Sequence, residues 1–222
     1  CTKNGTIKKT CLSDYSRPRT NGVNAINIAE GDRVVDVALT NGENEVVIAS
    51  KFGRAVRFNE STVRAMGRNA TGVRGINLED GEDNEVIGMV VIDKPEEETI
   101  LVVSEKGYGK RSDVQDYRIT NRGGKGVITL AVTEKTGLLT AIKSVTNDED
   151  LMIINKSGVT IRLHLESIKI QGRATQGVKL IELQKRGDTI ANVCVVPTED
   201  DEEELPEDAR AMDIPDPTQL GD

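Results

Sequence analysis

Aromatic side chains are scarce in this chain. Its 222 residues include no Trp, two Phe and three Tyr. Proteins that bind single-stranded nucleic acid, and RNA modules that read sequence, stack bases on aromatic rings, so the composition argues against both. The lack of Trp also argues against repeats of the WD type.

Histidine and cysteine are nearly as rare, which leaves little for catalysis or metal binding. His164 is the only histidine and alternates with leucines in "TIRLHLES", so we expect it on the polar face of a strand. Cys1, Cys11 and Cys194 have neither the even count of a disulfide framework nor the spacing of a metal site. The stretch "GYGKRS" lacks the distant Gly and the Ser/Thr of a P-loop. We therefore expect no catalytic residue, no metal site and no cofactor here, and an enzyme site between repeats is disfavoured.

Long apolar runs are also missing. No run approaches the roughly 18–20 residues that span a bilayer, and no leader pattern opens the chain. We expect a soluble, cytoplasmic protein with reduced thiols. Because the chain opens on "CTKNGTIKKT" rather than on Met, we also expect it to be a piece of a longer protein.

The net charge of −8 is unevenly distributed. Residues 198–222 carry eleven Asp/Glu and one Arg, a net of −10, which leaves 1–197 with a net of +2. Two regions follow: a mildly basic domain over 1–197 and an acidic tail over 198–222, which its composition predicts to be disordered. The tail is either a solubilising end or a mobile polyanion that competes with nucleic acid for a cationic surface.

What the chain does contain is an internal repeat. Turns ending at Gly5, Gly53, Gly107 and Gly158 are 48, 54 and 51 residues apart. A second series, ending in Gly-Val at Gly22, Gly72, Gly126 and Gly177, keeps step at 50, 54 and 51. Apolar runs such as "EVVIAS" precede the first-series glycines and alternating segments such as "RAVRF" follow them, which predicts hairpins with Gly at positive φ. Repeats of this length with about four short strands predict an all-β, propeller-like array of four blades.

A cation stands four residues past each hairpin glycine: Lys9, Arg57, Arg111 and Arg162. The alternation allows a purely structural reading, in which one strand position faces solvent. Four cations on equivalent strand faces instead favour a shared anionic partner, and we adopt that interpretation.

Each second-series glycine closes a cationic loop, "SRPRTNGV", "GRNATGV", "NRGGKGV" or "GRATQGV". Acidic residues gather instead at 41–45, 79–85, 94–98 and 147–150, so stacked repeats would have one cationic edge and one acidic edge. Cations and glycines without aromatics suit the backbone of duplex DNA, which would bend around the array. The predicted DNA contacts are Lys8, Lys9, Arg17, Arg19, Arg54, Arg57, Arg64, Arg68, Arg74, Lys110, Arg111, Arg118, Arg122, Gly123, Gly124, Lys125, Arg162, Arg173 and Lys179.

Several ordered motifs, among them "FGRAVRF", "VRAMGRNATGVRGINL", "KGYGKRSDVQDYR" and "GRATQGVKLIEL", resemble the C-terminal domain of bacterial DNA gyrase A subunits over 1–197. The resemblance implies a β-pinwheel whose blades exchange strands and wrap duplex DNA, so that the parent enzyme introduces negative supercoils. It also implies a parent A2B2 assembly in which ATP and Mg²⁺ bind elsewhere, and an acidic tail that modulates wrapping.

Two features depart from this family. It usually has six blades, so the four seen here, which look like the last four, should form an opened ring. The hallmark Q-R-R-G-G-K-G belongs to the first blade, and "NRGGKG" at 121–126 matches only its latter part, as a second box-like loop or as an ordinary repeat loop. The similar domain of topoisomerase IV and a propeller-like scaffold for protein partners remain alternatives.

Overall fold

The computed structural model describes residues 1–78, 83–183 and 187–198. Regular structure in this part of the chain consists of strands and short 3-10 helices, which confirms the all-β prediction. The strands are β1 (Thr6–Ile7), β2 (Glu45–Ser50), β3 (Arg54–Asn59), β4 (Val73–Arg74), β5 (Val86–Ile92), β6 (Thr99–Ser104), β7 (Tyr108–Asp113), β8 (Val127–Ile128), β9 (Leu139–Val145), β10 (Glu149–Asn155), β11 (Thr160–His164), β12 (Val178–Lys179) and β13 (Ile190–Pro197). The 3-10 helices are η1 (Leu12–Tyr15), η2 (Glu60–Thr62), η3 (Val114–Asp116) and η4 (Leu165–Ser167).

Three complete hairpins, β2–β3, β6–β7 and β10–β11, lie where the apolar runs and alternating segments predict them. Their turns contain Gly53, Gly107 and Gly158, which have φ values of 78°, 83° and 87°. Residues other than Gly rarely adopt this conformation, so the predicted reason for these glycines is confirmed.

Neighbouring repeats exchange strands. The sheet β5-β2-β3-β8 takes β8 from the following repeat, and the sheet β12-β7-β6-β9 takes β12 in the same way. The described part also contains a two-stranded sheet, β1-β4, and a three-stranded sheet, β11-β10-β13, whose outer strand β11 has no added strand beside it. The expected exchange is therefore present at three junctions between successive repeats.

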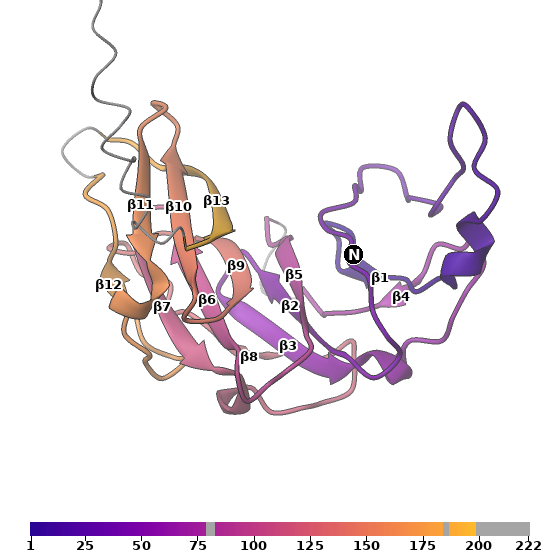
Figure 1. The fold of residues 1–222 in the computed structure, drawn as a ribbon, viewed down its shortest axis with the longest axis horizontal. Helices are drawn as coiled ribbons and strands as arrows, with labels where there is room; N and C mark the ends of the chain where they lie inside the picture. The colour runs from indigo at the N-terminus through magenta and orange to yellow at the C-terminus, as the bar shows by residue number, and fades with distance from the viewer. Residues whose placement is uncertain (79–82, 184–186, 199–222) are drawn as a thin grey trace, which may run out of the picture.

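Figure 1 shows the sheets following one another along an arc whose ends lie apart, as expected for an opened ring. The core lies between successive sheets. One apolar cluster joins Val47 and Val90 of one sheet to Ile100 and Ile142 of the next, and another joins Leu101 to Leu151 and Val193. No helix in the described residues is long and apolar enough to cross a membrane.

Candidate nucleic-acid interface

The outer edge of the array is formed by segments that cross from one repeat to the previous one. We call residues 60–74, 114–128 and 165–179 the straps. Each begins at a 3-10 helix, runs parallel to the preceding hairpin through the bridges Lys9↔Ala65, Arg57↔Ile119 or Arg111↔Ile170, and ends in the added strand β4, β8 or β12. Three of the four cationic loops predicted from the sequence lie on these straps; the first, over 16–23, lies before them.

Arg57 does not face solvent, so the purely structural reading of its strand position does not hold. Its side chain is 3% exposed and lies under the next strap. Nε donates to Glu45 Oε2 at 2.6 Å, while Nη1 donates to the carbonyls of Val114 at 2.7 Å and Tyr117 at 2.9 Å. The guanidinium therefore binds the strap to the sheet instead of facing a phosphate.

Arg111 occupies the same register one repeat later and is also buried. It donates to the Leu165 carbonyl at 2.9 Å and to Asn147 Oδ1 at 2.7 Å. Burial lowers the pKa of Arg111. Lys9 reaches the next 3-10 helix too, donating to the carbonyl and to Oε2 of Glu60, each at 3.1 Å. Lys9, Arg57 and Arg111 thus each hold a strap in this structure, and DNA contact by the hairpin cations stays a prediction.

Arg162, the fourth hairpin cation, lies on β11, where no strap follows in the described part of the chain. Its side chain is 37% exposed and pairs with Asp150 at 2.6 Å. Asp150 also accepts a hydrogen bond from Thr198 at 3.0 Å and lies 2.8 Å from His164 Nδ1. His164 thus lies on a strand with its side chain largely exposed, as predicted, and contacts a structural carboxylate.

Two predicted DNA contacts are lysines whose amines donate to backbone carbonyls of the straps. Lys110 is fully buried, and its Nζ donates to the carbonyls of Gly172, at 2.6 Å, and Arg173. Burial lowers the pKa of Lys110 to about 8. Lys8 donates in the same way to the carbonyls of Arg68, at 2.7 Å, and Ala25. Both position the loops, Lys110 from a fully buried place and Lys8 from a half-buried one.

Two strap arginines, Arg122 and Arg173, are half-buried and hold neighbouring repeats together. Arg122 donates to the carbonyls of Thr62 at 3.0 Å and Arg74 at 3.1 Å. Arg173 donates to Asp116 and Ile128 at 3.0 and 2.9 Å, which are the corresponding positions one repeat on. The loop of Arg122 is also fixed by its backbone, since Gly123 N donates to the Gly75 carbonyl at 2.6 Å. The "NRGGKG" loop is therefore pinned in place, with Gly124 and Lys125 exposed.

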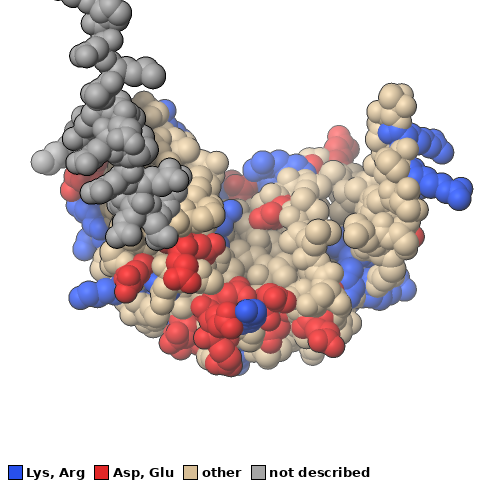
Figure 2. All heavy atoms as spheres, in the orientation of Figure 1, with Lys and Arg blue, Asp and Glu red and all other residues tan. Residues whose placement is uncertain are grey.

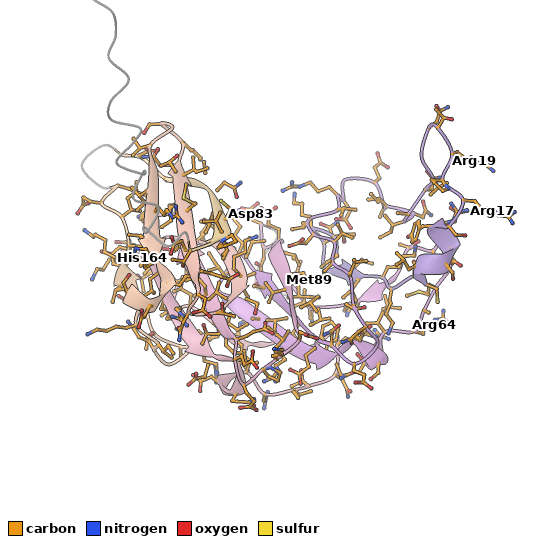
Figure 3. All side chains as sticks on the ribbon, in the orientation of Figure 1. Arg17, Arg19, Arg64, Asp83, Met89 and His164 are labelled. Atoms are coloured by element: carbon orange, nitrogen blue, oxygen red, sulfur yellow. The ribbon has the colours of Figure 1, made fainter. Side chains whose placement is uncertain are left out.

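A row of cations does face solvent on the straps. Arg64 and Arg118 are exposed two residues after the ends of η2 and η3, and Lys169 occupies the same position after η4. Lys169 was not among the predicted contacts, although aligning the repeats on their glycines would have found it. Figure 3 shows Arg64, Arg17 and Arg19 pointing away from the body at one end of the arc.

The remaining predicted residues are distributed around this row. Arg74 and Lys179 are exposed on β4 and β12, and Lys179 pairs with Glu182 at 2.7 Å. Arg54 and Arg68 are half-buried.

On the face drawn in Figure 2, Asp and Glu gather along the lower middle, whereas Lys and Arg lie mainly toward the two ends. Of the predicted acidic turns, 79–82 falls outside the described residues, as does nearly all of the predicted tail over 198–222.

Among the described residues, no three His, Cys, Asp or Glu side chains lie together so that they could hold a metal ion. Tyr117 is buried and its hydroxyl lies 2.6 Å from Thr129 Oγ1. Burial raises the pKa of Tyr117 to about 12, so this tyrosine acts as a core hydrogen-bonding group.

Known proteins are similar to this chain in sequence and in fold. The chain matches the family described as the DNA gyrase C-terminal domain, beta-propeller, over residues 1–41, 44–93, 98–146 and 149–197. The gyrase A protein of Staphylococcus epidermidis (strain ATCC 12228 / FDA PCI 1200) is 44% identical over 90% of this chain and 22% of that protein. The gyrase A protein of Staphylococcus aureus (strain NCTC 8325 / PS 47) is 44% identical over 95% and 23%. The chain thus spans less than a quarter of these relatives.

Two solved structures are similar in fold. The C-terminal domain of DNA topoisomerase IV has a TM-score of 0.82 at 26% identity, covering 90% of this chain and 61% of that one. The DNA gyrase A C-terminal domain has a TM-score of 0.76 at 25% identity, covering 86% and 62%. With four matched segments, strands exchanged between repeats and 44% identity to gyrase A proteins, this chain belongs to the DNA gyrase A C-terminal domain family.

Proposed function

We propose that this chain binds duplex DNA along its straps and bends it around the arc. The observation that carries the proposal is the exposed cation at one register of three successive straps, Arg64, Arg118 and Lys169. Arg74, Lys125 and Lys179 are exposed on the same segments. Contacts of this kind neutralise phosphates without reading bases, and a curved row of them favours a bent duplex.

Relatives that carry the gyrase A name support a finer proposal for the whole protein. Wrapping by this domain would present a neighbouring segment of duplex to a parent topoisomerase, which then introduces negative supercoils. The parent would be an A2B2 assembly whose ATP and Mg²⁺ sites lie outside this chain, in the cytoplasm and on the nucleoid. The boundary between a domain over 1–197 and an acidic modulating tail over 198–222 belongs to the same proposal.

The test compares two triple variants that change the net charge equally. In the first, Arg64, Arg118 and Lys169 become Glu; in the matched control, Arg33, Lys94 and Lys156 do, which are exposed but lie off the straps. Binding of linear duplex is measured over a range of salt concentrations. The strap variant should bind more weakly at every sequence, and the slope of log K against log salt should fall by about 2.7, at 0.9 per phosphate contact.

A control that loses as much slope would mean that net charge alone matters. If neither variant changes DNA affinity, a scaffold for protein partners becomes the better reading. Nicked circular plasmid ligated in the presence of the chain then tests wrapping, because chiral wrapping shifts the linking-number distribution and simple binding does not.

A further inference from the structure

The repeats differ in what lies beneath their straps. At two junctions a lysine amine fills this space and donates to strap carbonyls: Lys110 to Gly172 and Arg173, and Lys8 to Arg68. The geometry follows a common register. Lys110 precedes Arg111, whose bridge partner is Ile170, and the accepting carbonyls come two and three residues after that partner.

Val56 takes the place of the lysine at the junction between them. It precedes Arg57, whose bridge partner is Ile119, so the corresponding carbonyls are those of Asn121 and Arg122. A cavity of about 230 Å³ lies at this place, beneath the "NRGGKG" loop. Val56, Asn121 and Gly124 are among the residues that line it. The space that an amine occupies at the other two junctions is thus open here.

The chemistry of the walls indicates what could enter. Ala55, Val56 and Val127 supply an apolar side, which suits an alkyl chain better than a hydrated metal ion. The Asn121 carbonyl lies 3.3 Å from Thr120 Oγ1 and keeps a second lone pair for another donor. Carbonyl oxygens disfavour an anion. Three cations also line the cavity: Arg57, whose buried guanidinium is paired with Glu45, and Arg118 and Lys125, which are exposed so that solvent screens their charges.

We propose that this cavity binds the amino group of an aliphatic amine, such as one end of a polyamine. The alkyl part packs on Val56, and the amine donates to the strap carbonyls as Lys110 does one repeat later. Because burial lowers the pKa of Lys110 to about 8, an amine in this position serves as a donor in either protonation state. The site does not depend on DNA binding.

The test uses the full chain, labelled with ¹⁵N, and n-propylammonium chloride as the probe. Amide signals of 120–126 should shift saturably, while those of 171–177 stay in place because Lys110 fills that junction. Tetramethylammonium chloride, which has no N–H donor, is the control at equal ionic strength. Equal shifts with both salts, or no saturable shift at 120–126, would overturn the proposal.

Two variants sharpen the result. Val56→Lys should place a tethered amine in the cavity and abolish the shifts at 120–126. Since Val56 also packs in an apolar cluster, Lys110→Ala gives an independent test: it opens the neighbouring junction, so the probe should now shift 171–177 as well. A Lys110→Ala chain in which 171–177 still does not respond would show that strap carbonyls do not bind amines.

Discussion

Arg57 and Arg64 have the same side-chain type seven residues apart, yet the structure gives them opposite roles. Arg57 makes three hydrogen bonds beneath a strap, and Arg64 faces solvent. Arg57→Met leaves Glu45 and the carbonyls of Val114 and Tyr117 without this donor. Removing one partner from a buried ion pair costs about 3–5 kcal/mol, and we expect the free energy of unfolding to fall by that amount.

Thermal unfolding and salt-dependent DNA binding together measure the difference. For a chain of this size the loss corresponds to a fall in Tm of roughly 10 °C. The folded variant should keep the wild-type salt slope. Arg64→Met is the matched control, with stability within about 0.5 kcal/mol of wild type and a slope reduced by about 0.9.

The reverse pattern would refute this assignment. If Arg57→Met left the Tm unchanged and flattened the salt dependence, the side chain would have to leave the strap and contact phosphate. Such a result would support the interpretation of the hairpin cations as phosphate contacts.

Other predictions concern single contacts. Gly126→Ala should destabilise the chain by roughly 2 kcal/mol or more in urea unfolding, because φ is 74° and the new Cβ would lie 2.3 Å from the Ala55 carbonyl oxygen. A urea midpoint equal to that of wild type would contradict this prediction. Lys110→Met should lose stability relative to wild type as pH rises from 7 to 10. The pKa of Lys110 in the folded chain is lowered to about 8, so above this pH the unfolded chain binds more protons than the folded chain, and the stability of the wild type rises. Tyr117→Phe should cost about 1 kcal/mol in the free energy of unfolding, since Thr129 loses its buried partner.

The repeat period and local patterns predicted much of the fold. The runs "EVVIAS" and "TILVVS" are β2 and β6, and the hairpin glycines have the positive φ expected of them. These features depend on neighbouring residues, so they are readable in sequence. Pairing of β8 with β3 joins different repeats, and only the family resemblance implied such an exchange.

The burial of the predicted site residues could not be read from the sequence, because burial depends on what crosses a strand. Alternation places Arg57 on one face of β3 but does not say that the next strap covers it. The predicted loop cations were divided in the same way: Arg118 is exposed, whereas Arg122 donates to backbone carbonyls. Lys169 is the opposite case: aligning the repeats identifies its position, although the sequence around it does not mark it as a contact.

Arg162 provides an internal comparison for this argument. It has the register of Arg57 and Arg111, but no strap crosses β11 in the described residues. Its side chain is 37% exposed, against 3% for Arg57. The same residue at the same strand position is therefore buried by its neighbour rather than by its own repeat. We would expect a strap added beside β11 to bury Arg162 and to move its hydrogen bond from Asp150 to a 3-10 helix carbonyl. The hairpin cation therefore connects one repeat to the next.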